Sequence, residues 1–327
     1  MSKICYQSAL KTNCFNIVDV GAGVGHLSRM LAYQYGFLVS TLEANEQLNQ
    51  MAYKLDMELE NKLLRKGISH SNPKRILHFN YRVDESTTSS QIMSIIKEAF
   101  QSDNGQFKFG IVGLHPCGNL GSMLLKLYNN CSNISFINIV SCCYMKLSFE
   151  SNLFTGYPLS HVCLKKQFKL DYLSCETACH AIENYVSKLK TENHHHLKIH
   201  AFRAGLETIL VNINLDLKHS AVGNVKYEEN MTFEEYCDRA LKKMNVQIPK
   251  SKMKDVEKMV EASWEKVVKF YSARLFLAPL VESIILYDRL LYLAESNSHC
   301  NIVPVFDCKI SPRNHVLRAE KIFAKEY

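Results

Sequence analysis

Several patterns that would place a protein outside the ordinary globular class are missing from this 327-residue sequence. The N-terminus has no apolar core followed by a cleavage site, so the sequence predicts no secretory signal. None of the 12 cysteines forms a C-x-x-C pair, which argues against a metal site. The longest apolar segment, 275–293, contains Pro279, Glu282, Asp288 and Arg289, and these residues predict a buried helix that does not span a membrane.

The cysteines and the charges together favour an intracellular protein of mild basicity. Cys142 and Cys143 close an apolar, strand-like run, which is typical of reduced thiols, so we expect a cytoplasmic or nuclear location. The net charge of +7 is spread evenly, with 14 Lys/Arg against 11 Asp/Glu in residues 1–150 and 25 against 21 in residues 151–327. Such even basicity is compatible with an RNA partner but does not require one.

The most informative segment is Asn16–Leu27, which predicts a strand, a glycine loop and then a helix. Three glycines follow the strand at alternate positions of the loop 21–25. Glycine lets the backbone approach a ligand closely, and a helix N-terminus offers free N–H groups to a polar or anionic ligand. The segment therefore predicts a site for a nucleotide-like ligand.

Spacing decides which nucleotide is favoured. The dinucleotide fingerprint needs a third glycine where this chain has His26. The next apolar run, 37–42, ends at Glu43, near the offset of about 20 residues expected for a carboxylate that binds ribose hydroxyls. With Asp19 at the end of the first strand, this arrangement resembles Rossmann-like methyltransferases that use S-adenosylmethionine (SAM). That resemblance implies that the loop holds the methionine end and that Glu43 binds the ribose. An NAD site and a glycine turn without a ligand are the less favoured alternatives.

Alternating strands and helices predict an α/β fold with a parallel sheet covered on both faces. Further strands are expected at 75–79, 107–114 and 134–140, and helices at 45–66, 89–100 and 120–128. From residue 171 the pattern becomes helical, and two extended runs, 302–309 and 315–321, follow as a hairpin. We therefore expect a class I methyltransferase sheet with three parts: a SAM-binding core at 1–165, a helical insertion at 166–298 and a C-terminal hairpin at 299–327 that completes the sheet.

Ordered motifs along most of the chain resemble the methyltransferase-like protein 25 family, some members of which are labelled ribosomal RNA adenine dimethylase domain-containing. The matching segments are Val18–Ser28, Gly113–Leu120, Ser141–Ser148, Gly156–Ser160, Leu277–Glu282, Asp288–Leu293 and Ser311–Arg313. The resemblance implies a methyltransferase whose cofactor is SAM, and it leaves the substrate unnamed. Family members usually carry a substantial segment before the glycine loop, whereas here only residues 1–15 precede it, which suggests a short form or a truncated gene model.

The acceptor chemistry is expected at the ends of the fourth and fifth strands. Amino-adenine methyltransferases place Asn, Asp or Ser before Pro-Pro-aromatic there, and Leu114–Gly118 does not match that pattern. His115 is instead a candidate general base, with Cys117 beside it and Tyr144 available to stack on an acceptor or to donate a hydrogen bond. Similar His-x-Cys-Gly and Cys-Cys pairs occur in a transfer-RNA ribose 2′-O-methyltransferase family, which makes a ribose hydroxyl a plausible acceptor. The alternative is that the Cys142–Cys143 pair only packs as small apolar side chains.

These observations predict methyl transfer from SAM to a macromolecule, with RNA favoured over protein. A catalytically silent binding or scaffold protein is the alternative. The predicted catalytic residues are His115, Cys117 and Tyr144, and no metal ligand is predicted. The predicted cofactor-binding residues are Asp19, Gly21, Ala22, Gly23, Gly25, His26, Glu43 and Leu114.

Overall fold

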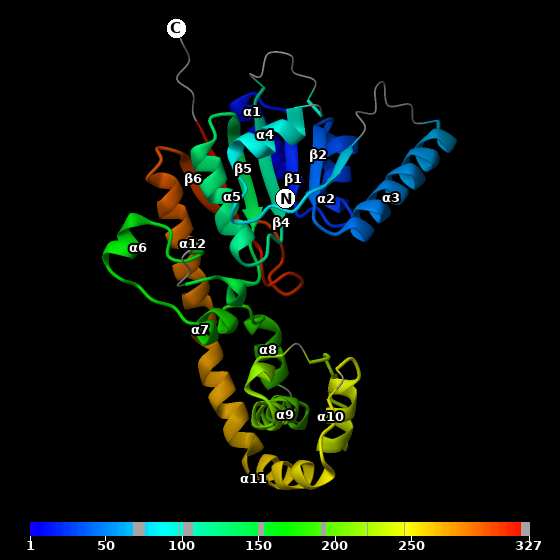
Figure 1. Ribbon diagram of the computed structural model, residues 1–327, viewed down its shortest axis with the longest axis vertical. Helices are drawn as coiled ribbons and strands as arrows, with labels where there is room; N and C mark the ends of the chain where they lie inside the picture. Colours follow the sequence, from blue (N-terminus) through cyan, green and yellow to red (C-terminus); the bar gives the residue numbers. More distant parts are fainter. Residues whose placement is uncertain are drawn as a thin grey trace. The chain divides into compact units, whose positions relative to one another are not determined.

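The structure is a computed structural model that describes residues 1–67, 76–97, 99–100, 107–149, 154–190, 194–220, 222–244 and 246–321 (Figure 1). The chain divides into two compact units. The first comprises Met1–His180 and Pro279–Tyr327, and the second comprises Ala181–Ala278. In the described parts of the chain, no helix combines the length and the hydropathy that crossing a bilayer requires.

The first unit is built on a seven-stranded sheet in the order β3-β2-β1-β4-β5-β7-β6. Strands β1 to β5 are parallel, and β7 pairs antiparallel with both β5 and β6. This order confirms the predicted α/β, Rossmann-like class I methyltransferase sheet, including its C-terminal hairpin. The strands are β1 Asn16–Val20, β2 Leu38–Glu43, β3 Leu77–Asn80, β4 Phe109–Leu114, β5 Ile134–Val140, β6 His299–Pro304 and β7 His315–Glu320.

The central strands are apolar along their whole length because helices cover both of their faces. All seven residues of β5 are buried, as are all residues of β4 except Leu114. The register pairs Val20 of β1 with Leu42 of β2, and Leu114 of β4 with Val140 of β5. The carboxyl ends of these strands therefore reach the same edge of the sheet, where ligands of doubly wound sheets bind.

Alternate residues of the strands feed two separate cores, one on each face of the sheet. One core contains Val18, Leu124 and Leu293, to which helices α4, α5 and α12 contribute. The other contains Ile17 and Leu31, to which α1 and α2 contribute. The helices of this unit are α1 Ser2–Thr12, α2 His26–Arg29 with its π-helical continuation Met30–Gln34, α3 Glu46–Arg65, α4 Ser89–Lys97, α5 Asn119–Asn130, α6 His161–Lys165, α7 Tyr172–Thr177 and α12 Ala278–Ala294.

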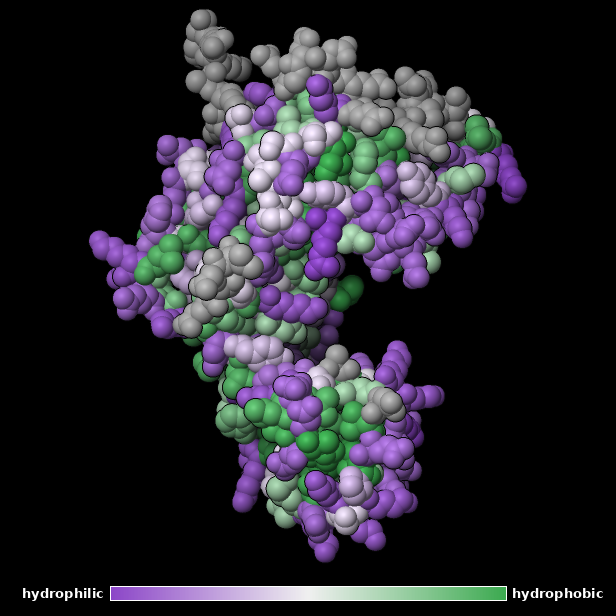
Figure 2. Space-filling view, viewed as in Figure 1, coloured by the Kyte–Doolittle hydropathy of each residue, from purple (hydrophilic) through white to green (hydrophobic). Residues whose placement is uncertain are grey.

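The second unit is helical and has a core of its own. Its helices are α8 Ile182–Leu189, α9 Ile199–Ile213, α10 Phe233–Leu241 and α11 Lys250–Leu275. Phe202, Phe233 and Tyr236 are buried together, and Trp264 packs partly buried against them. On the face shown in Figure 2, hydrophobic residues gather over the middle of this unit, whereas hydrophilic residues cover most of α3 in the first unit. The predicted division of the chain into a core at 1–165, an insertion at 166–298 and a hairpin at 299–327 stays a prediction.

Candidate functional site

The glycine loop leaves β1 and begins α2, as the sequence predicts. Gly21, Gly23 and Gly25 have φ angles of 70°, 58° and 76°, a left-handed region that residues with a Cβ rarely adopt. This explains the alternate spacing of the glycines. The Gly21 N–H donates to the Leu42 carbonyl at 2.8 Å, and the Gly25 N–H donates to the Ala22 carbonyl at 2.9 Å. The loop is thereby held at the carboxyl ends of β1 and β2.

Asp19 lies beneath this loop with its carboxylate out of solvent and only partly satisfied. The side chain is 1% exposed, and its Oδ2 accepts a hydrogen bond from Ser28 Oγ at 2.6 Å. Oδ1 has no partner among the described residues. Burial raises the pKa of Asp19 to about 6, against the lowering effect of the Ser28 hydroxyl. A buried, unpaired carboxylate oxygen is costly, so Asp19 is an acceptor that a ligand donor could satisfy.

Glu43 ends β2 with its carboxylate held against the glycine loop. Its Oε2 accepts from the Gly23 N–H at 2.8 Å, and its Oε1 accepts from the Asn45 N–H at 2.9 Å. Asn45 in turn caps α3, because its side-chain oxygen accepts from the backbone of Gln47 and Leu48. Each oxygen of Glu43 can accept a second hydrogen bond, so the carboxylate is fixed in place but not saturated.

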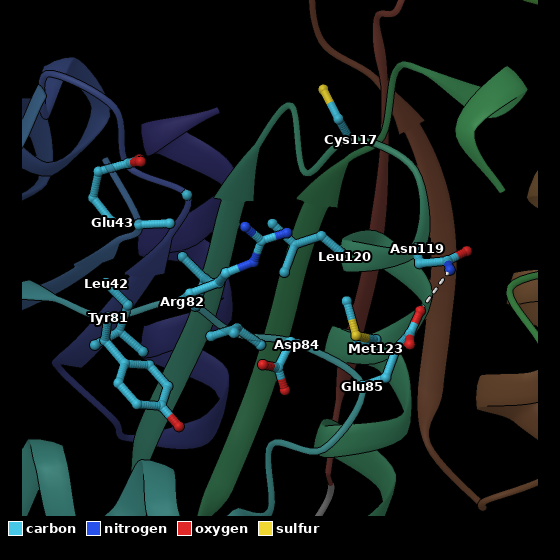
Figure 3. Close-up of a pocket in the computed structure, with 14 residues that line it drawn as sticks. Leu42, Glu43, Tyr81, Arg82, Asp84, Glu85, Cys117, Asn119, Leu120 and Met123 are labelled. Carbon is cyan, nitrogen blue, oxygen red and sulfur yellow. Dashed lines mark hydrogen bonds between the residues drawn. The ribbon is translucent and has the colours of Figure 1, made fainter. Parts of the chain in front are cut away.

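A cavity of about 440 Å³ opens at this edge of the sheet. The ends of β1 and β2 form part of its wall, including Gly21 and Glu43. The segment 81–85 after β3, together with Cys117 and the start of α5, forms the rest (Figure 3). Two residues of this wall are joined directly, because Asn119 donates a hydrogen bond to Glu85 at 3.2 Å. Such a volume is in the range of pockets for small ligands and cofactors.

The remaining predicted cofactor residues do not line this cavity. Asp19, Ala22, Gly23 and Gly25 shape the loop. Leu114 is half-buried at the end of β4. His26 begins α2, where its Nδ1 lies 3.3 Å from Arg29 Nη2, and it lines a different cavity beside Met30 and Tyr33. The segment 81–85 after β3 also lines the cavity, but it is not among the predicted site residues because it has no distinctive motif.

A buried polar network braces the loop from below, and sequence reasoning missed it. Arg29 donates to Asp56 Oδ1 at 2.7 Å and to the Val24 carbonyl at 2.6 Å. The second carboxylate oxygen of Asp56 lies 2.8 Å from His78 Nε2, and His78 Nδ1 lies 2.8 Å from Thr41 Oγ1. The only signal in the sequence is an arginine on the apolar side of a short helix, which does not identify its partners.

The predicted acceptor residues at the ends of β4 and β5 occupy different surroundings. His115 is exposed with φ of 68°, its N–H donates to the Val140 carbonyl, and it does not line the cavity. Tyr144 is buried in the core, where its hydroxyl donates to Glu282 Oε1 at 3.2 Å and its ring lies 5.7 Å from the Arg289 guanidinium carbon. Burial raises the pKa of Tyr144 far above its ordinary value. Of the three predicted catalytic residues, only Cys117 lines the cavity.

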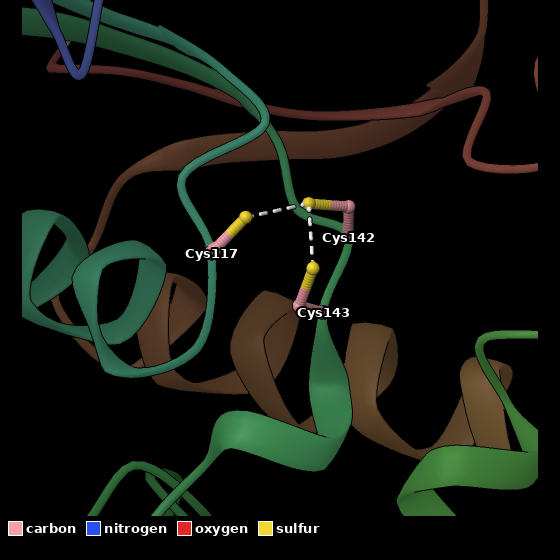
Figure 4. Close-up of side chains that lie close together, drawn as sticks. All are labelled: Cys117, Cys142 and Cys143. Carbon is pink, nitrogen blue, oxygen red and sulfur yellow. Dashed lines mark hydrogen bonds between the residues drawn. The ribbon is translucent and has the colours of Figure 1, made fainter. Parts of the chain in front are cut away.

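Cys117 belongs to a cluster of three thiols. Its Sγ lies 3.1 Å from Cys142 Sγ, which lies 3.6 Å from Cys143 Sγ (Figure 4). Hydrogen bonding from Cys142 lowers the pKa of Cys117 to about 5, and the same contact raises the pKa of Cys142. Gly118, with φ of 58°, lets the two loops meet, because a Cβ there would lie 2.7 Å from the Lys146 carbonyl oxygen.

Comparison with known proteins agrees with this geometry. Residues 1–150 match a family described as a methyltransferase domain. The probable methyltransferase-like protein 25 of Homo sapiens is 27% identical over 227 residues, which cover 64% of this chain and 36% of that protein. The Mus musculus protein of the same name is 26% identical over 228 residues, covering 64% of this chain and 37% of the relative. The chain thus spans little more than a third of the length of these curated relatives.

Among solved structures, the chain is similar to a magnesium protoporphyrin IX methyltransferase from Synechocystis PCC 6803 with bound SAM. The TM-score is 0.27 at 14% identity, covering 42% of this chain and 55% of that one. The resemblance to methyltransferase-like protein 25 is confirmed by the sequence comparisons. Residues 1–150 are therefore similar to a methyltransferase domain, and this region contains the glycine loop and five strands of the sheet.

Proposed function

We propose that this chain binds SAM in the cavity at the ends of β1, β2 and β4 and transfers its methyl group to a macromolecule, with RNA as the acceptor. One observation carries the proposal. Glu43 and Gly21 both line the cavity, and the Glu43 carboxylate accepts a hydrogen bond from the Gly23 N–H of the glycine loop. At the base of this loop, Asp19 has a carboxylate oxygen without a partner among the described residues.

The chain's own residues fit the two ends of such a donor. The unpaired Oδ1 of Asp19 suits a cationic ammonium group, which would stabilise the ionised carboxylate that burial disfavours. The free lone pairs of Glu43 suit two vicinal ribose hydroxyls. Val83, Leu120 and Met123 give the cavity an apolar wall against which a flat base can pack. When bound, SAM supplies a methyl group on a sulfonium sulfur.

On the acceptor side, the chain has to position a nucleophile and, where the acceptor is a hydroxyl, remove its proton. Cys117 lies in the cavity wall and His115 stands exposed in the same loop. We propose His115 as the base for a ribose hydroxyl and Cys117 as a residue that contacts the acceptor. Tyr144 lies in the core, so its contribution would be to hold the loop after β5 through Glu282.

The mild positive charge over the whole chain supports RNA as the acceptor. A protein acceptor is the second candidate. A catalytically silent scaffold is the third, and it is disfavoured by the retention of Asp19, the glycines and Glu43 together.

The first test is calorimetric titration of the chain with SAM and with S-adenosylhomocysteine. Glu43→Ala should weaken binding by about 1–3 kcal/mol, or roughly 5–150-fold, because ribose hydrogen bonds are lost. Glu46→Ala is the matched control, since Glu46 is an exposed residue of the first turn of α3. Unchanged affinity in Glu43→Ala would exclude the ribose contact. Labelled-methyl transfer to cellular RNA and protein fractions then distinguishes the acceptors, and binding without transfer to either would favour the scaffold.

A further inference from the structure

The thiol cluster of Cys117, Cys142 and Cys143 is assembled by the topology of the sheet. Cys117 follows β4 and the other two follow β5, and these strands are parallel neighbours that end at the same level. All three sulfur atoms lie within 4.8 Å of one another and point toward a common centre (Figure 4). Cys117 is exposed and the other two are half-buried, so an ion from solvent can reach them.

The spacing of the sulfurs fits a tetrahedral metal centre. A Zn–S bond of about 2.3 Å implies a separation of about 3.8 Å between sulfurs bound to the same ion. The Cys117–Cys142 and Cys142–Cys143 separations of 3.1 and 3.6 Å require only small side-chain movements to reach that value. The lack of C-x-x-C spacing carries little weight at this place, because adjacent strands and not one short loop bring the ligands together.

A buried cation lies beside the cluster and would balance its charge. Three thiolates and one Zn²⁺ carry a net charge of −1. The Arg289 side chain is 1% exposed, and its Nε and Nη1 have no hydrogen-bond partner within the described ranges. A Cβ added to Gly121 would lie 3.6 Å from Arg289 Nη1 and 2.8 Å from the hydroxyl oxygen of Ser141, the residue directly before Cys142. The remaining nitrogen, Nη2, donates a hydrogen bond to Ser122 Oγ at 3.3 Å. A buried arginine with two unsatisfied nitrogens is costly, and a neighbouring anionic centre would offset that cost.

We propose that Cys117, Cys142 and Cys143 bind one Zn²⁺ through three thiolates and leave its fourth position open. Three protein ligands with one exchangeable position are typical of zinc sites that act on a substrate. Because Cys117 also lines the donor cavity, the open position would stand on the acceptor side of that cavity. The inference does not depend on methyl transfer, because the metal site can be tested with the reduced protein and metal alone.

The test is titration of the reduced 327-residue chain with Co²⁺, followed by displacement with Zn²⁺. We expect sulfur-to-cobalt charge-transfer absorption and the intense d–d bands of a tetrahedral centre, with one cobalt bound per chain and displaced by one zinc. Cys117→Ser and Cys142→Ser should each lower the zinc affinity by more than the roughly 10–100-fold that changes outside the ligand set produce. Cys300→Ser is the control, because Cys300 is a half-buried cysteine of the outermost strand, β6.

A folded, reduced chain that binds no stoichiometric cobalt or zinc would overturn the proposal. So would a loss of binding in Cys300→Ser as large as that in Cys117→Ser. Circular dichroism of each variant establishes that it is folded. Donor binding is measured separately with Glu43→Ala, so failure of the metal site and failure of the proposed methyl transfer are distinguishable.

Discussion

Asp19 is the residue at which folding and ligand binding make opposite demands. Its carboxyl group is buried, one oxygen is unpaired, and burial raises its pKa to about 6. In the unfolded chain the same group ionises near pH 3.9. Above pH 6 the ionised Asp19 therefore destabilises the folded chain when no ligand is bound. A cationic ligand group next to the carboxylate would offset this destabilisation.

Asp19→Asn should make stability less dependent on pH. Because the pKa of Asp19 is raised in the folded chain, protonation of this group favours folding. That contribution to stability is fully present below about pH 4 and is lost as pH rises through 6. Ionised Asp19 then costs about 3 kcal/mol at pH 8, so the variant should be more stable than the natural chain at pH 8 and similar to it at pH 4. Urea unfolding at both values measures this. The exposed Glu58→Gln is the control, and an equal difference at both pH values would contradict the prediction.

His115→Ala should separate turnover from donor binding. A general base typically contributes about 10²–10⁴-fold to the rate, and His115 does not line the donor cavity. We therefore expect the rate of methyl transfer to fall by that order while calorimetric SAM affinity stays unchanged. His161→Ala, which removes another exposed imidazole, should leave the rate unaffected. Full activity in His115→Ala would rule out the base.

At the scale of elements, apolar runs predict the sheet well, because buried parallel strands have no polar face to confuse the pattern. The strand predicted at 134–140 coincides with β5, and 107–114 overlaps β4. Helix α1 was not predicted, since its polar composition gives no apolar stripe; only Cys5, Ser8 and Ala9 are buried. Its place is fixed instead by a tertiary contact, in which Ser8 Oγ donates to Glu320 Oε1 at 2.8 Å.

The candidate site is predictable only where one segment carries the signal. The glycine loop and Glu43 could be found because strand ends and φ requirements are local properties. The thiols of Cys117 and Cys142 could be expected near each other, since neighbouring strands end together. The network of Arg29, Asp56 and His78 could not be predicted, because its members lie on three elements and their pairing depends on how α3 packs against the sheet.

Asp56→Ala should reveal how much this network stabilises the first unit. The substitution leaves the Arg29 guanidinium buried without a carboxylate, and breaking such a pair typically costs about 3–5 kcal/mol. Urea unfolding measures the free energy of unfolding. Glu58→Ala changes an exposed carboxylate of the same helix and should shift the free energy by less than about 0.5 kcal/mol. Similar values for the two variants would show that the network contributes little.

At the scale of the whole molecule, the helical sequence pattern that begins at residue 171 does not show in which hydrophobic core each helix packs. Helices α7 and α12 contribute Cys175, Val281 and Ile285 to a cluster with Tyr144 and Tyr157 in the first unit. Helices α9, α10 and α11 instead form the core of the second unit. Amphipathic periodicity gives the apolar face of a helix but not its partner, which is why the unit boundaries do not follow from the sequence.

Separate cores predict separate responses to the donor. All residues of the proposed SAM site lie in the first unit, so SAM should stabilise only the unfolding transition of that unit. At a concentration about 100 times Kd the gain is about 2.7 kcal/mol. Scanning calorimetry of the whole chain should show two transitions, of which SAM raises the Tm of one, and Glu43→Ala should reduce that shift. A single transition that moves as a whole would mean that the two units unfold as one cooperative body.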